Sequence, residues 1–236
     1  MILLLDCDNT LYPASSGIME LSDRRMNRFI QQKFGLDLEE TQRLRVDYLR
    51  RYGTTLKGLM LHHAVDPDEY LSFVHGYSLD GVVEPNPRLA SFLRRAGIPR
   101  VVFTSANREH VEHVAQALGI ADCIDAIYDL ASVDYEGKPA DGAYARVMAD
   151  YPGERAVFVD DRLLNFPVAR RAKMITVLIE EMPVGERLDA YAALTVFREE
   201  AKLLQEQRPE LVDFTLRRVE ELDGIWDEVV ARAERQ

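Results

Sequence analysis

Three short apolar runs that end in polar residues constrain the fold of this chain more than any other feature. The runs, each with the residues that close it, are 2–5 with Asp6, 101–104 with Thr104, and 156–159 with Asp160 and Asp161. Uninterrupted apolar runs of this length are typical of strands that are buried on both faces of a parallel sheet. The sequence therefore predicts a sheet with helices packed on both of its faces.

Helical patterns lie between these runs. The apolar residues of 111–118 recur with helical spacing, and Gly119 suits the position after the end of a helix. Further helices are predicted at 87–96 and 139–150, and weaker strands at 125–128 and 174–179. This alternation favours an α/β fold with a doubly wound, Rossmann-like parallel sheet. Since ligands bind at the carboxyl ends of the strands in such folds, Asp6, Thr104 and Asp160 are expected to meet at one edge.

One long segment breaks the alternation. Residues 14–75 contain helical patterns and no strand pattern, so the sequence predicts three regions. These are a catalytic core at 1–13 and 83–182, a helical cap at 14–82, and a C-terminal helical hairpin extension at 183–236. Because the cap follows the carboxyl end of the first strand, it is expected to cover the site as a lid.

Two amphipathic stripes on either side of Pro209 predict the C-terminal hairpin. They consist of Leu194, Phe197, Ala201 and Leu204, and of Val212, Leu216, Val219, Trp226 and Val230. Apolar residues at this spacing indicate helices that bury one face. Two interpretations remain open, an appendage packed on the core and an element through which a homodimer forms.

The charge of the chain limits the classes of partner. The 236 residues include 40 acidic and 29 basic side chains, which gives a formal net charge of −11. A negative surface repels nucleic-acid backbones and anionic lipids, so neither a nucleic acid nor a membrane is an expected partner. We expect a cytoplasmic protein, because the sequence shows neither a secretory signal pattern nor a membrane-spanning apolar run. Cys7 and Cys123 are expected to be buried thiols in a reducing compartment.

Asp6 and Asp8 lie two residues apart, just past the first predicted strand. Covalent phosphoryl transfer needs such a pair, because one carboxylate attacks phosphorus while the other exchanges a proton with the leaving oxygen and then with water. Two solvated loop acids are the alternative interpretation.

Asp160 and Asp161 form a second acidic pair, directly after a predicted buried strand. Two such carboxylates repel each other unless a cation or a proton intervenes, and hard carboxylate oxygens suit Mg²⁺. Helix capping is the alternative role for either residue.

The segment from Thr104 to Asn107 and the lysine at 138 supply candidates for phosphate binding. The hydroxyls of Thr104 and Ser105, together with backbone N–H groups at a helix start, suit a phosphate group, and Asn107 lies in the same turn. Lys138 precedes a predicted helix, where a cation would neutralise the phosphoryl group and keep Asp6 ionised. A simple helix cap and a surface lysine are the alternatives.

Taken in this order, the four elements resemble the motifs of the haloacid dehalogenase superfamily of phosphohydrolases over roughly residues 1–180. The resemblance implies an aspartyl-phosphate mechanism and a Mg²⁺ cofactor. The implied catalytic roles are Asp6 as nucleophile and Asp8 as general acid and base, with Thr104 and Lys138 as the residues of the second and third motifs. The implied metal ligands are Asp6, the backbone carbonyl of Asp8 and Asp161, with Asp160 beside them.

A narrower resemblance concerns the substrate. The segment 6–13 and two cap segments, 52–56 and 72–76, are similar to the pyrimidine 5′-nucleotidase branch, although Ser105 and Arg162 differ from its usual residues. This resemblance implies a small phosphorylated metabolite, a nucleoside 5′-monophosphate, as the substrate. It also implies that Tyr12 and His75 contact it.

Other functions are consistent with parts of the pattern. A phosphatase or a phosphomutase of another small phosphometabolite would use the same motifs. A binding or scaffold protein would use the C-terminal hairpin and would not need the acidic residues and Lys138 together. A dehalogenase would need neither the acid at Asp8 nor the pair at Asp160 and Asp161.

Overall fold

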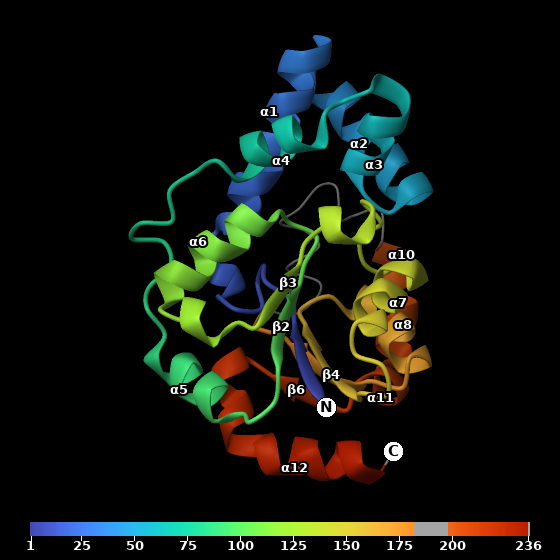
Figure 1. Cartoon of the computed structure of the whole chain (residues 1–236). Coiled ribbons are helices and arrows are strands. Elements are labelled where there is room, and N and C mark those ends of the chain that lie inside the picture. The colour runs from blue at the N-terminus through green and yellow to red at the C-terminus, as the bar shows by residue number, and fades with distance from the viewer. Residues whose placement is uncertain (182–197, 236) are drawn as a thin grey trace.

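A computed structural model describes residues 1–181 and 198–235. In this part of the chain six parallel strands form one sheet, in the order β3-β2-β1-β4-β5-β6, with helices on both faces (Figure 1). The strands are β1 Ile2–Leu5, β2 Arg100–Phe103, β3 Ala126–Tyr128, β4 Ala156–Asp160, β5 Ile175–Ile179 and β6 Phe214–Leu216. The predicted fold class, an α/β protein with a Rossmann-like parallel sheet, is confirmed.

β1 lies in the middle of the sheet because all four of its side chains are apolar. It pairs with β2 on one side and with β4 on the other. Leu3 and Leu5 pack into the core on one face, while Ile2 and Leu4 pack into the core on the opposite face. Full burial of such a side chain stabilises the fold by roughly 1.5–3 kcal/mol, so a polar residue in this strand would be strongly unfavourable.

The two faces are covered by different helices. The core that contains Leu3 also includes side chains of α5 (Pro87–Arg95), α6 (Arg108–Leu118) and α12 (Leu222–Arg235). The core that contains Leu4 is closed by α7 (Asp141–Ala149), α8 (Phe166–Arg171), α10 (Arg198–Glu206) and α11 (Arg208–Leu211). Short 3₁₀ turns connect these elements: η1 Ala14–Ser16, η2 Ala121–Cys123, η3 Ala131–Val133, η4 Leu163–Asn165 and η6 Val219–Glu221.

The predicted helical segment after the first strand folds as a separate bundle. It consists of α1 (Ile18–Phe34), α2 (Leu38–Tyr52), α3 (Thr55–His63) and α4 (Pro67–His75). These helices have their own apolar cluster, which includes Phe29, Leu59 and Tyr70. Leu130, which follows β3, joins this cluster from the core. The bundle lies beyond the carboxyl ends of the strands, at the opposite end of the sheet from α12 (Figure 1).

The C-terminal part differs from the predicted hairpin. Phe214–Leu216 form β6, a sixth parallel strand beside β5, so the second predicted stripe is a strand followed by α12 rather than one helix. The physical reason is Asp213, whose buried carboxylate accepts hydrogen bonds from the backbone N–H of Thr176 and from Arg170 and Arg232. Of the first stripe, Leu194 and Phe197 lie outside the described residues.

Two simpler expectations concern the cysteines and membrane spans. Cys7 and Cys123 are buried and unpaired, as predicted. Within residues 1–181 and 198–235, no helix combines the length and the apolar character that a membrane crossing requires.

Candidate active site at the carboxyl edge of the sheet

Three neighbouring strands bring the predicted acidic and hydroxyl residues together. Asp6 follows β1, Thr104 follows β2, and Asp160 ends β4. The backbone N–H of Asp6 still donates to the carbonyl of Val159 at 2.9 Å, which holds the first residue past β1 against β4. Because β1 pairs with both β2 and β4, these strand ends converge at one edge, as predicted.

A tight turn after β1 places the second acid. The carbonyl of Cys7 accepts hydrogen bonds from the N–H groups of Thr10 and Leu11, and Asn9 has a left-handed backbone with φ of 57°. Asparagine adopts this conformation more readily than most residues. The turn therefore keeps Asp8 close to Asp6, and both line the same cavity.

Lys138 lies between two carboxylates. Its Nζ donates to Oδ1 of Asp6 at 2.7 Å and to Oδ2 of Asp160 at 2.6 Å, and its side chain is 3% exposed. Burial alone would lower the pKa of Lys138, but the negative charges of Asp160 and Asp6 outweigh burial and raise it. Lys138 is therefore charged and fixed beside the predicted nucleophile.

Asp160 is occupied by hydrogen bonds to the protein. Besides Lys138, Nδ2 of Asn165 donates to both of its oxygens at 2.9 Å, and the backbone N–H of Arg162 donates to Oδ1 at 2.8 Å. Asp161 instead lines the cavity, where Nδ2 of Asn9 donates to its Oδ2 at 3.4 Å. The two neighbouring acids thus have different surroundings.

The carboxylates of Asp6, Asp160 and Asp161 form a cluster that suits a divalent cation. One oxygen of each lies within 4.8 Å of the others. Burial raises the pKa of Asp6 well above its ordinary value; Lys138 opposes this effect, and the charges of Asp160 and Asp161 add to it. A hard cation such as Mg²⁺ would relieve this repulsion, and its preferred ligands are carboxylate and carbonyl oxygens. The residues present therefore fit a magnesium ion.

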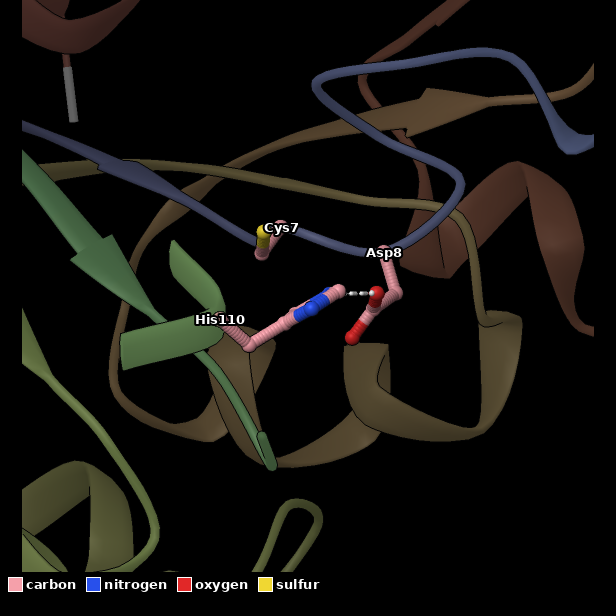
Figure 2. A group of neighbouring side chains, drawn as sticks. All are labelled: Cys7, Asp8 and His110. Carbon is pink, nitrogen blue, oxygen red and sulfur yellow. Dashed lines mark hydrogen bonds and ion pairs between the residues drawn. The ribbon is translucent and has the colours of Figure 1, made fainter. Parts of the chain in front are cut away.

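Asp8 is held by two donors on a single oxygen. Nε2 of His110 in α6 donates to Oδ1 at 2.8 Å, as Figure 2 shows, and the hydroxyl of Tyr12 donates to the same oxygen. Burial raises the pKa of Asp8, but His110, His75 and Tyr12 together outweigh burial, so that the pKa lies below its ordinary range. The ring of His75, at the end of cap helix α4, stacks on His110 with centroids 4.6 Å apart.

The segment after β2 forms the opposite wall. The hydroxyl of Thr104 accepts a hydrogen bond from the N–H of Ala106 at 3.1 Å, which orders the turn before α6. Thr104 and Ser105 line the cavity. Asn107 is the N-cap residue of α6, without a side-chain cap hydrogen bond, and it is not among the cavity-lining residues.

A cavity of about 200 Å³ separates the core from the cap. Its floor carries the acids and Lys138 described above. Its roof consists largely of apolar cap residues, which include Met26, Leu49, Leu56 and Val74. His75 lines the cavity, whereas Tyr12 does not. The hydroxyl of Tyr12 turns toward Asp8, and only 2% of the residue is exposed, so its contact with substrate stays a prediction.

A model of the haloacid dehalogenase-like hydrolase family matches residues 1–173. The chain belongs to this family. This finding confirms the resemblance seen in the motifs and the prediction of an enzyme of the haloacid dehalogenase type.

One curated yeast protein and two solved structures share at most 27% sequence identity with this haloacid dehalogenase-like hydrolase. Phosphate metabolism protein 8 of Saccharomyces cerevisiae is 27% identical over 135 residues, which cover 53% of this chain and 42% of that protein. Among solved structures, CbbY from Rhodobacter sphaeroides in complex with phosphate superposes with a TM-score of 0.56 at 21% identity, over 94% of this chain and 95% of that one. Magnesium-bound YfnB from Bacillus subtilis gives 0.55 at 14% identity, over 95% and 97%. The two structures show a shared fold.

Sequence reasoning missed His110, which contacts the Asp8 carboxyl of this haloacid dehalogenase-like hydrolase. It lies on the buried face of α6 together with Val111 and Val114. The signal was a histidine on an otherwise apolar helix face, within one turn of the segment that begins with Thr104. Only the fold shows that this face meets the turn that carries Asp8.

Proposed function

We propose that this haloacid dehalogenase-like hydrolase is a Mg²⁺-dependent phosphomonoester hydrolase that acts through an aspartyl-phosphate on Asp6. The observation that carries the proposal is the arrangement around Asp6. Lys138 is 2.7 Å away on one side, Asp160 and Asp161 lie in the same cluster, and Asp8 lines the same cavity.

The residues divide the reaction into two proton-balanced steps. In the first step Asp6 attacks phosphorus, the bond from phosphorus to the leaving oxygen breaks, and Asp8 gives its proton to that oxygen. In the second step Asp8 takes a proton from a water molecule, which attacks the aspartyl-phosphate and releases phosphate. Lys138 stabilises the charge on the transferring group, and Thr104 and Ser105 offer hydroxyls to its oxygens.

The protonation of Asp8 depends on the substrate. In the free protein its pKa lies below the ordinary range, despite burial, because His110 stabilises the ionised form. A phosphate dianion in the same cavity raises the pKa of a nearby carboxyl by charge repulsion. An anionic substrate therefore favours the protonated form of Asp8 that the first step needs, and its absence favours the ionised form that acts as a base.

Asp6, Asp161 and the backbone carbonyl of Asp8 would hold the metal. Asp160 is assigned to positioning Lys138, because both of its oxygens already accept hydrogen bonds from the protein. Mg²⁺ supplies positive charge that offsets the developing charge on the phosphoryl oxygens. The magnesium bound to YfnB, a protein with the same fold, supports this choice of ion.

The proposed substrate class is a nucleoside 5′-monophosphate. Its support is the resemblance of 6–13 and of the cap segments to the nucleotidase branch, together with an apolar roof that suits a base. The cavity of about 200 Å³ is smaller than the roughly 300–1,000 Å³ of pockets for larger ligands. A nucleotide therefore requires the cap to open further, whereas a smaller phosphometabolite, the second candidate, does not.

Phosphate release from a panel of monoesters, with and without Mg²⁺, tests the proposal. The panel should contain pyrimidine and purine 5′-monophosphates, sugar phosphates and phosphoglycolate. We expect metal-dependent release that is lost in Asp6→Asn and retained in Asp122→Asn, a matched change at an exposed surface ion pair.

Two outcomes would contradict the proposal. Full activity in Asp6→Asn would exclude Asp6 as the nucleophile. No release from any ester would favour a phosphomutase, which transfers the group within its substrate, or a scaffold protein. Light scattering would then test whether the chain forms a homodimer.

A further inference from the structure

We propose that His110 is a positioning residue for Asp8, that it directs the transferable proton to Oδ2 of that carboxyl, and that the cap residue His75 braces it. The inference rests on the proposed function, because it concerns how Asp8 protonates the leaving oxygen. It assigns a further role to His110, and it gives His75 a role that the two reaction steps do not include.

The first argument is the occupancy of the Asp8 carboxyl. Oδ1 accepts hydrogen bonds from both Nε2 of His110 and the hydroxyl of Tyr12, and among the described residues no donor is recorded for Oδ2. Two donors on one oxygen concentrate negative charge there, so a proton on the carboxyl belongs on the other oxygen. Asp8 lines the cavity, where the leaving oxygen must lie.

The second argument is the fixed position of the imidazole. His110 is 2% exposed and projects from the first turn of α6, so its approach to Asp8 is set by the packing of that helix against the sheet (Figure 2). A general acid needs this kind of support, because a misplacement of about 1 Å in a reacting group lowers the rate by roughly 10²-fold.

The third argument is that a side chain of the cap packs against the imidazole of His110. The ring of His75 stacks on it at an interplanar angle of 26°, and the ring of Tyr77 meets it edge-on with centroids 6.0 Å apart. Both residues belong to the segment through which the chain leaves the cap. Because His75 ends α4 of the cap, movement of the cap away from the core removes its stacking contact with His110, so the alignment of Asp8 is coupled to closure over the substrate.

The leaving group of the substrate separates this role from simple packing. The value of kcat/KM reports only the steps up to release of the alcohol, in which Asp8 acts as the acid. A nitrophenolate leaves without help from a proton, whereas an alkoxide does not. A defect in proton delivery therefore affects alkyl phosphates and spares p-nitrophenyl phosphate.

The experiment compares kcat/KM for p-nitrophenyl phosphate and for the best alkyl monoester in His110→Ala. We expect a loss of about 10²-fold for the alkyl ester and of less than about threefold for p-nitrophenyl phosphate. His110→Gln, which keeps an N–H donor, should recover part of the alkyl activity. His75→Ala should also lower kcat/KM selectively for the alkyl ester, by a smaller factor than His110→Ala. His75→Phe, which keeps an aromatic ring, should lower this kcat/KM less than His75→Ala.

His113→Gln, on the exposed side of the same helix, is the matched control and should behave as wild type. Equal losses on both esters would overturn the inference and reduce His110 to a packing residue. That result is distinct from failure of the proposed function, in which wild type releases no phosphate or Asp6→Asn remains active. Circular dichroism of His110→Gln would confirm that the comparison is made on folded protein.

Discussion

Lys138 and the acids around it determine the charge balance of the site. The ammonium group of Lys138 pairs with both Asp6 and Asp160, and Asp161 lies in the same acidic cluster. One ammonium group therefore lies between two carboxylates. Burial raises the pKa of Asp6, so its ionised form destabilises the metal-free fold.

This charge imbalance predicts how magnesium stabilises the protein. At a Mg²⁺ concentration of about 100 times its Kd we expect a gain of about 2.7 kcal/mol, which is a rise in Tm of roughly 5–10 °C. Asp161→Asn should lose most of this gain in differential scanning fluorimetry, and Asp122→Asn should keep it. An equal gain in both variants would exclude Asp161 as a ligand.

The same imbalance predicts a pH dependence with a definite sign. Because the pKa of Asp6 is raised in the folded protein, above the ordinary value of 3.8, Asp6 is protonated in the folded state before the unfolded state as the pH falls. The destabilisation is present above the raised pKa and is removed between that pKa and 3.8. The rise in Tm caused by Mg²⁺ should therefore shrink as the pH falls through this window, and a constant rise would contradict the assignment.

The residues of the site were predictable to different degrees. Asp6, Thr104 and Asp160 could be placed together from sequence because parallel strand ends meet at one edge. The separate surroundings of Asp160 and Asp161 could not, because they depend on Asn165 reaching back from the next turn. The contact of the Tyr12 hydroxyl with Asp8 could not be predicted either, because nothing in the spacing shows which way this side chain turns.

At the scale of elements, β6 shows where periodicity fails. Leu216 and Val219 fit a helical stripe, but the sequence from Phe214 to Leu216 fits a strand equally well. Three residues are too few for either pattern to decide. The choice is made by Asp213, through contacts with β5, α8 and α12 that are distant in sequence. By contrast, β1 and β4 were predictable because every residue in them is buried.

Asp213 therefore offers a test of this element. Its side chain is 2% exposed and pairs with Arg170 and Arg232. We expect Asp213→Asn to lower the free energy of unfolding by about 2 kcal/mol, because hydrogen bonds to charged groups are lost at a buried position. Urea denaturation gives the value, with Asp227→Asn on the exposed side of α12 as the control. Equal stability of the two variants would show that β6 is held by other contacts.

At the scale of the whole molecule, Leu130 of the core packs into the apolar cluster of the cap, together with the partly buried Tyr135. Leu130 is 2% exposed within the cap cluster and also lines the cavity. Lys57 adds a hydrogen bond from the cap to the carbonyl of Asp134 at 3.1 Å. The cap thus has an apolar cluster of its own, which suits a lid that moves relative to the catalytic core.

Leu130→Ala should weaken the packing between the cap and the core. We expect the free energy of unfolding to fall by about 2–5 kcal/mol and hydrogen exchange in the cap to increase. KM should rise more than kcat falls, because the roof of the cavity is displaced while the acids stay in place. Leu61→Ala, at a cap position that is 60% exposed, is the control. An unchanged KM would mean that Leu130 stabilises the apolar cluster of the cap but does not hold the cap over the cavity.

The insertion of the cap between β1 and β2 also has a consequence for synthesis on the ribosome. The cap helices make mostly local contacts and can fold as they emerge, at about 5–20 residues per second. β1 cannot do so, because its neighbours β2 and β4 begin only at Arg100 and Ala156. The most apolar strand of the sheet therefore stays unpaired for several seconds after it is made. During that interval the nascent chain presents a binding site for chaperones, and Asp6, which follows β1, lacks its partner Lys138 until that residue is translated.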